Sequence, residues 1–257
     1  MKIAVVIRQV PDLVEPLEVD SSGKALDFSS AAFVLNESDD HALEQALLLK
    51  ERHGGSVSVL AIDFGNVDDA LYAAAAKGAD QLIKLAWEDP DRSPQPQQAA
   101  ALYAEVLRPL SPDLVLVGVQ AHDELDGALP VELAACLDWP YVGVVRGVQP
   151  LDSEHVLVRK EFPGAVMAEF QVRLPAVLGI LGAEQPPRYV PVSRIRAAMK
   201  STQIVEQSPT IPPRISRVEV ERLYPPAPAE RAEMLTGSPE DVAKRIAALL
   251  EEKGLLR

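Results

Sequence analysis

Short apolar runs alternate with helical patterns over the first 145 residues, and this alternation limits the possible folds most strongly. The runs rich in Val, Ile and Leu are residues 2–7, 57–62, 80–85, 114–117 and 141–145. Helical patterns lie between them. One begins at Ser38 or Asp39, either of which can cap it, and ends at Gly54, and the others cover 68–77, 97–110 and 130–137. The alternation predicts right-handed βαβ units and therefore an α/β fold, a doubly wound, mostly parallel sheet.

The pattern changes after residue 150. Two segments of period-two alternation, joined at Phe162-Pro163-Gly164, predict an antiparallel hairpin over 155–172, and 175–180 reads as another buried strand. Prolines then punctuate the chain up to a last helix that Ser238 caps. We therefore expect an α/β domain over 1–185 and an extended C-terminal arm over 186–257 that packs on a partner.

The stretch 114–139 has the order strand, glycine-containing loop, helix. This order can place backbone N–H groups and a helix N-terminus against a phosphate, but an ordinary βα turn has the same order. Ligands of parallel sheets bind at the carboxyl ends of the strands. The loops 8–12, 63–66 and 120–129 are therefore expected to meet at one edge; Pro11 predicts that 8–12 leaves the first strand as a loop.

Composition excludes several classes of function. A net charge of −13 argues against nucleic acid as a principal partner. No apolar run reaches the roughly 20 residues of a membrane span. The single cysteine, Cys136, excludes an internal disulfide and favours a cytoplasmic setting. The four histidines lack metal-ligand spacing, and His122 reads as a loop residue rather than a general base. The acids Asp123, Glu124 and Asp126 suit helix caps better than a metal site. The sequence does not indicate catalysis by side chains.

Several ordered features make the chain similar to the β subunits of electron transfer flavoproteins, including nitrogen-fixation-associated homologues. The similarity covers residues 1 to about 200. The features are Arg8-Gln9-Val10-Pro11-Asp12, Leu35-Asn36-Glu37, Gly78-Ala79-Asp80, Gly118-Val119-Gln120-Ala121, Trp139-Pro140, Leu174-Pro175-Ala176-Val177, and Pro187-Arg188-Tyr189 before Met199-Lys200.

The resemblance implies a Rossmann-like, adenine-nucleotide-binding fold and a heterodimer with an α subunit that carries most of the redox-active FAD. It also implies AMP, or a second FAD, on this chain, and transient contacts with a dehydrogenase and an acceptor oxidoreductase such as a quinone reductase. The nucleotide contacts that the family's motifs imply are Arg8, Gln9, Asn36, Asp63, Phe64, Gly65, Gln120, Asp123, Asp126, Gly127, Ala128 and Leu129.

One loop departs from the family pattern. Where relatives read Asn-Gln-Thr-Gly, this chain has Gly127, Ala128, Leu129 and Pro130, so the amide and hydroxyl donors are missing and Pro130 has no N–H. AMP, FAD or an empty site all stay open. A nucleotide-free structural subunit and a stand-alone nucleotide-binding module are the alternatives.

The resemblance also implies a docking segment for the dehydrogenase. Val192 matches a leucine that anchors the partner in relatives, and Arg194 and Arg196 lie beside it. With Arg188 and Lys200 these arginines form a positive cluster in an acidic chain, which suits steering of an acidic partner. Alternatively Val192 packs under the arm and the arginines are solvated or paired to the α subunit.

Overall fold

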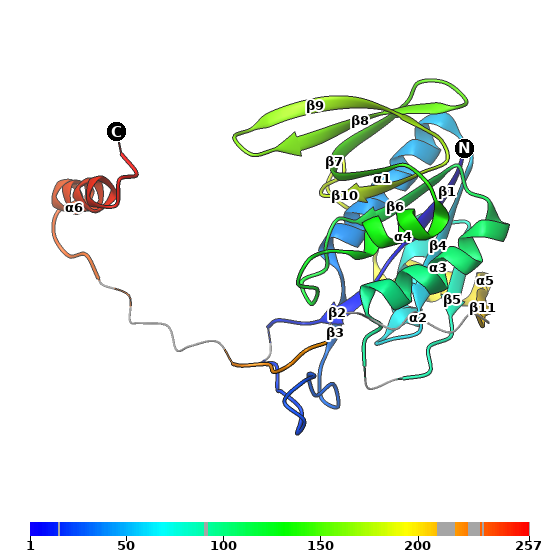
Figure 1. Ribbon diagram of the computed structural model, residues 1–257, viewed down its shortest axis with the longest axis horizontal. Coiled ribbons are helices and arrows are strands. Elements are labelled where there is room, and N and C mark those ends of the chain that lie inside the picture. The colour runs from blue at the N-terminus through cyan, green and yellow to red at the C-terminus, as the bar shows by residue number, and fades with distance from the viewer. Residues whose placement is uncertain (15, 90–91, 210–218, 226–231, 233, 257) are drawn as a thin grey trace. The chain divides into compact units, whose positions relative to one another are not determined.

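A nine-stranded sheet forms the centre of the fold (Figure 1). The computed structural model describes residues 1–14, 16–89, 92–209, 219–225, 232 and 234–256. The strands of the sheet lie in the order β11-β5-β4-β1-β6-β10-β7-β8-β9. Their bounds are β1 (Lys2–Val6), β4 (Ser56–Ile62), β5 (Gln81–Leu85), β6 (Leu114–Gly118), β7 (Tyr141–Pro150), β8 (His155–Phe162), β9 (Val166–Arg173), β10 (Ala176–Ile180) and β11 (Ile204–Gln207). All pairs from β11 to β7 are parallel.

Helices cover both faces of this sheet, as the alternation predicts. The helices are α1 (Glu37–His53), α2 (Val67–Lys77), α3 (Pro96–Leu110) and α4 (Leu129–Leu137). On β1, Ile3 and Val5 pack in one core with α1 and α2, while Ala4 and Val6 pack in a second core with α3 and α4. Successive residues of a strand point to opposite faces, so one strand supplies both cores. The doubly wound α/β fold is confirmed.

The antiparallel part is the predicted hairpin. β8 pairs with β9 from His155↔Arg173 to Phe162↔Val166, and β8 also pairs antiparallel with the end of β7. Gly164 turns the chain with a φ of +80°, a conformation that costs a glycine little. β9 is the last strand in the order of the described strands and forms one edge of the sheet.

The expectation that 8–12 is a loop is wrong. Gln9 to Pro11 form a short strand, β2 (Gln9–Pro11), which pairs antiparallel with β3 (Phe33–Leu35) in a separate two-stranded sheet. Pro11 is compatible with this strand because a two-stranded sheet has only edge strands, where a missing N–H need not break a ladder bond.

The first part of the expected arm folds on the domain instead. Residues 192–201 form α5 (Val192–Ser201), which packs on α2 through Ile195 and Ala198, and β11 extends the sheet beside β5. The chain divides into a unit over 1–223 and a second unit over 224–257. The second unit contains α6 (Pro239–Glu252), and Ser238 caps it as predicted, accepting from the Asp241 N–H at 3.2 Å.

The rest of the expected arm is described only in part. Residues 210–218, 226–231 and 233 lie outside the described residues, so most of its proline-rich stretch does too. Among the residues that are described, no helix combines the length and the apolar character that crossing a membrane requires.

Candidate functional site

Arg8 lies at the carboxyl end of β1, and its guanidinium group organises the edge of the sheet where ligands are expected. Its side chain is only 12% exposed. The Asp39 carboxylate, which is fully buried, accepts from Arg8 Nε and Nη2 at 2.9 Å each and from the Arg8 backbone N–H at 2.9 Å. Two parallel hydrogen bonds between a guanidinium and a carboxylate form a strong and geometrically specific ion pair.

Asp39 also fixes the end of β6, because its Oδ1 accepts from the Gly118 N–H at 2.9 Å. A Cβ at residue 118 would collide with the Asp39 carboxylate and with the backbone at Ser38, so only glycine fits at this strand end. The prediction that Ser38 or Asp39 caps α1 is wrong. Asn36 is the N-cap residue, and its side-chain amide donates to the Gln120 carbonyl at 3.0 Å rather than to the helix.

Glu124 supplies the second carboxylate on Arg8, from the loop between β6 and α4. Its Oε1 lies 2.8 Å from Arg8 Nη1, and the Glu124 side chain is 14% exposed. Burial raises the pKa of Glu124, while the nearby Arg8 charge and its hydrogen bond oppose that rise. Burial also acts to lower the pKa of Arg8, but attraction and hydrogen bonds from Asp39 and Glu124 outweigh it and the pKa is raised. Arg8 is therefore permanently charged.

Tyr103 of α3 forms part of the wall of the crevice that contains Arg8. It is 1% exposed, and its hydroxyl accepts from the Ile62 N–H at 3.1 Å, at the end of β4. Sequence reasoning missed Asp39 and Tyr103 as members of this site, and it interpreted Glu124 as a helix-cap acid rather than as a partner of Arg8. A usable signal was present: Arg8 directly follows a buried apolar strand, and a charge in that position needs a buried counter-ion.

The structure brings some of the expected contact residues together around Arg8 and leaves others apart. Those that line the crevice are Gln9, Phe64, Asp123, Leu129 and Arg8 itself. Asn36 and Gln120 hold the loop through the bond described above. Asp63, by contrast, faces β5, where it lies 3.8 Å from Lys84 Nζ.

The remaining expected contacts lie in the loops beside the crevice. Gly65 has a φ of +68° and is packed against the Phe33 ring, and Asp126 is exposed. Gly127 has a φ of +58°, and a Cβ there would lie 2.9 Å from the Val119 carbonyl oxygen. Ala128 is the N-cap residue of α4, with no side-chain cap bond. The side chains of residues 127–130 have no hydrogen-bond donor, so this helix end offers a phosphate only backbone N–H groups.

The crevice between these groups is almost filled. About 40 Å³ remains, which is close to the share of one water molecule in the liquid, whereas pockets for small ligands measure about 300–1,000 Å³. The lining offers one cation, Arg8, and two carboxylates, Asp123 and Glu124, with Asp39 behind them. In this arrangement the residues present do not fit an adenine nucleotide and its phosphate.

A larger, mainly apolar cavity lies next to the crevice and measures about 1140 Å³. Its wall combines the loop after β2, the segment before α3 and Leu223, and it includes His122, whose Nε2 lies 2.7 Å from the Pro11 carbonyl oxygen. That contact uses one ring nitrogen of His122 for loop packing. Among the described residues no group of three or more His, Cys, Asp or Glu side chains has the arrangement of a metal site.

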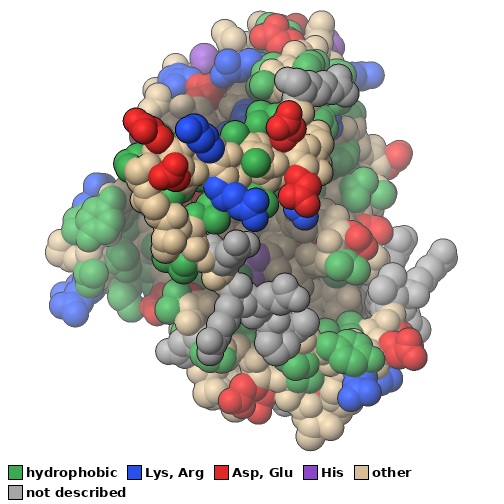
Figure 2. Space-filling view, turned by 90° about the vertical axis from the view of Figure 1, so that its left-hand side faces the viewer, with side chains coloured by type: hydrophobic (Ala, Val, Ile, Leu, Met, Phe, Trp, Pro, Cys, Tyr) green, Lys and Arg blue, Asp and Glu red, His purple; other side chains and the backbone are tan. Residues whose placement is uncertain are grey.

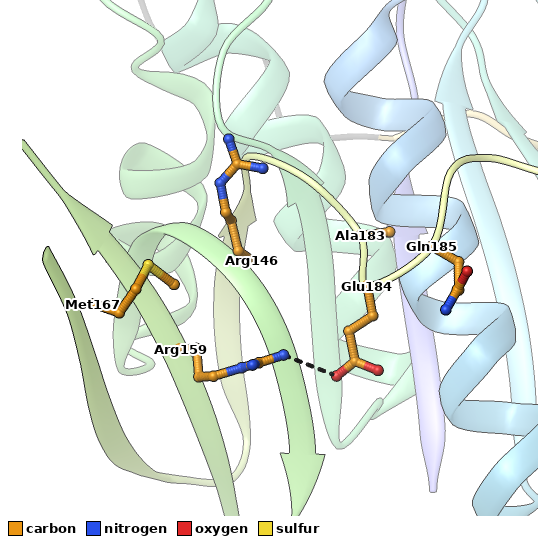
Figure 3. Close-up of a pocket in the computed structure, with 6 residues that line it drawn as sticks. All are labelled: Arg146, Arg159, Met167, Ala183, Glu184 and Gln185. Carbon is orange, nitrogen blue, oxygen red and sulfur yellow. Dashed lines mark ion pairs between the residues drawn. The ribbon is translucent and has the colours of Figure 1, made fainter. Parts of the chain in front are cut away.

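A third hollow, of about 450 Å³, lies between the β8–β9 hairpin and the segment after β10 (Figure 3). Its arginines have partners already. Arg159 points to Glu184, with Nη2 3.8 Å from Oε1, and Arg146 points away from that pair and contacts Glu161. Glu184 is also 2.5 Å from Arg52, so the hollow is not an open anion site.

The expected docking residues are exposed on α5. Val192, the first residue of this helix, is 58% exposed, and Arg194 and Arg196 are exposed as well. Arg188 does not belong to their positive cluster. Its side chain lies 2.8 Å from Glu44 and 2.5 Å from Glu51, both on α1, and its backbone N–H donates to Glu44 at 3.0 Å. Arg188 therefore anchors the segment to α1.

Comparison with known proteins finds one family over most of the chain. Residues 25–211 match the family model described as electron transfer flavoprotein domain. The chain is 30% identical to the electron transfer flavoprotein subunit beta of Methylophilus methylotrophus, over 98% of both chains. It is 25% identical to the Bacillus subtilis protein of the same name, again over 98% of both. The Clostridium acetobutylicum relative is 30% identical over 77% of this chain and 75% of its own length.

Proposed function

This chain belongs to the electron transfer flavoprotein β-subunit family, and we propose that it is the β subunit of a heterodimer whose α subunit carries the redox-active FAD. Proteins of this family carry electrons and are not catalytic enzymes. The heterodimer would accept electrons from a dehydrogenase and pass them through FAD to a quinone reductase or another acceptor. The observation that carries this proposal is the similarity to β subunits over 98% of both chains.

Surface apolar groups support a role as a subunit. In the space-filling view, hydrophobic side chains reach the surface among acidic and basic ones (Figure 2). Within the second unit, Ile246 on α6 is 45% exposed and no α6 residue is buried. On the hairpin, Val166 and Phe170 are 56% and 40% exposed. They lie on the same face of β9 as Val172, which is buried in the core. Such continuous apolar surfaces are typical of regions that a partner covers.

We further propose that the second unit, 224–257, packs on the α subunit. A helix with an apolar stripe is stable in water mainly when that stripe is buried. On α6 the stripe is formed by Val242, Ile246, Leu249 and Leu250.

The docking of the dehydrogenase is proposed for the start of α5. Val192 and Tyr189 are exposed there, Tyr189 to 85%, and Arg194 beside them is exposed as well. This segment therefore combines an apolar anchor with a positive charge. In such an interface the anchor supplies affinity, and the arginines act mainly on the association rate.

The test is co-expression of this chain with an electron transfer flavoprotein α subunit from the same organism, followed by an absorbance spectrum and a count of bound flavin. We expect a yellow complex with FAD, and a colourless β chain when it is produced alone. Stoichiometric FAD on the isolated β chain would contradict the proposal and indicate an independent flavoprotein. A β chain that fails to form a complex would contradict it as well.

A further inference from the structure

We propose that Glu124 is a built-in ligand of Arg8, and that this chain keeps its crevice closed and takes no adenine nucleotide there. The inference deepens the proposed function, since it concerns what this β subunit itself brings to the complex. It rests on three features of the crevice. The N–H donors of Arg8 are already engaged, the carboxylates outnumber the single cation, and the loop between β6 and α4 holds Glu124 in place.

The donors of Arg8 are almost all in use. A guanidinium group has five N–H donors. Four bonds leave it here: Nε and Nη2 donate to Asp39, Nη2 also donates to the Gly118 carbonyl at 3.2 Å, and Nη1 donates to Glu124. A phosphate that needs a two-pronged contact would therefore have to displace a carboxylate. Glu124 is the one that can leave, because it lies on a loop and is 14% exposed, whereas Asp39 is fully buried in the first turn of α1.

The charge of the crevice also disfavours a phosphate. Arg8 is the one cationic side chain among the described residues that line it. Asp39 and Glu124 pair with that charge, and the carboxylate of Asp123, an exposed residue, lines the same crevice. A phosphate monoester would add a charge of about −2 to a site that already has more negative than positive groups. In a partly buried site such like-charge repulsion is weakly screened.

The loop between β6 and α4 holds Glu124 over Arg8 by its own contacts. Gln120 Nε2 donates to the Glu124 carbonyl at 3.3 Å, and the Gln120 carbonyl accepts from Asn36. The Glu124 N–H donates to the Ala121 carbonyl at 3.1 Å. The loop thus closes on protein groups. One Glu124 oxygen, Oε2, is buried with no hydrogen-bond partner among the described groups.

The first experiment counts nucleotides in the assembled complex. The co-expressed heterodimer is denatured, and the released AMP, ADP and FAD are separated by chromatography and counted per β chain. We expect no AMP or ADP, and no more than one FAD per heterodimer. One AMP per β chain, or a second FAD, would overturn the inference while leaving the proposed electron-transfer function intact. That function would fail separately, through a complex that does not form or holds no flavin.

The second experiment uses the full-length chain and AMP as the probe, in equilibrium dialysis. Glu124→Gln keeps the shape of the side chain but removes one negative charge, so we expect AMP to bind at least about tenfold more tightly than to the parent. Glu132→Gln is the matched control. Glu132 is also half-buried and lies on the adjoining helix α4, but its carboxylate contacts Gln97 at 3.5 Å.

The comparison of the two variants decides the matter. The inference predicts that Glu132→Gln binds AMP as weakly as the parent and that Glu124→Gln binds it more tightly. Equal affinity of the two variants would show that Glu124 does not exclude the nucleotide. Tight binding of AMP by the unmodified chain would show that the crevice opens in spite of Glu124. Either result would overturn the inference.

Discussion

Replacement of Asp39 by alanine is expected to destabilise the main unit strongly. The carboxylate is fully buried and accepts four hydrogen bonds, three from Arg8 and one from the Gly118 N–H. Its removal leaves a largely buried guanidinium charge with Glu124 as its remaining carboxylate partner, and two backbone N–H groups without an acceptor. Breaking a buried ion pair from one side costs about 3–5 kcal/mol, so we expect a loss of this size in the free energy of unfolding.

The conservative change Asp39→Asn separates charge from shape. An asparagine keeps one acceptor oxygen for Gly118 but gives Arg8 no negative charge. Its amide NH₂ group would then face the Arg8 backbone N–H and Nε–H in place of Oδ2, so Asp39→Asn should cost about 3 kcal/mol, at the lower end of the range for a broken buried ion pair. Asp126→Asn removes the same charge from an exposed position, and its effect should stay within about 0.5 kcal/mol.

The assay is urea unfolding followed by tryptophan fluorescence. Trp87 and Trp139, the two tryptophans of the chain, both lie in the unit over 1–223, so the signal reports on that unit without a contribution from α6. In thermal unfolding the Asp39→Ala variant should melt about 10 °C lower, because 1 kcal/mol corresponds to about 2–4 °C at this size.

A double-mutant cycle with Arg8→Met tests the assignment to this pair. The combined variant should be less destabilised than the sum of the single ones, by about 1–3 kcal/mol. The reasoning is refuted if Asp39→Ala costs less than about 1 kcal/mol, or if the effects of the two substitutions simply add.

Three further predictions concern other parts of the chain. The hydrogen bond from Arg188 lowers the pKa of Glu51 below its ordinary value of 4.5, so the pair stabilises the fold fully above pH 4.5, and this contribution is lost as the pH falls through the lower pKa of the folded state. Arg188→Met should therefore flatten the acid unfolding curve in that pH range, and an unchanged curve would refute the prediction. Deletion of 224–257 should leave the unfolding curve of the main unit unchanged and weaken association with the α subunit at least tenfold in ultracentrifugation; unchanged association would show that this segment is not an interface. Val192→Ala should slow reduction of the complex by its dehydrogenase severalfold with flavin content unchanged, whereas dissociation of the complex would make Val192 a structural residue.

The order of strands and helices could be predicted because hydrophobic periodicity is a local property. The expected strands 2–7, 57–62, 80–85 and 114–117 appear within one residue of their predicted bounds, and 141–145 begins as predicted but continues to Pro150. The C-terminal boundary could not be predicted in this way. The segment 186–207 reads as an arm because its prolines interrupt any periodicity, yet Arg188 ties it to α1 and Ile204 pairs with Leu82 at the sheet edge. Both contacts depend on residues more than 100 positions away.

The candidate site shows the same division. The sequence places Arg8 and the 120–129 loop at one edge, because parallel strands end there together. It does not show that Arg8 turns inward. Asp39 stands in the first turn of a helix, where a carboxylate usually interacts with the helix N-terminus, but here it accepts from Arg8 and from the Gly118 N–H. A tertiary contact thus overrides a local preference.

The strand order also has a consequence for synthesis of the chain on the ribosome. β7 does not pair with β6, because β10 lies between them and is made later, after the whole β8–β9 hairpin. At ordinary rates of translation, the edge of β6 is open on the order of seconds before residues 176–180 emerge. Both β6 and β7 expose unpaired backbone during that interval, and β10 closes both edges at once. A nascent chain that stalls between 150 and 176 therefore presents two unpaired strand edges together, and either edge could pair with another chain.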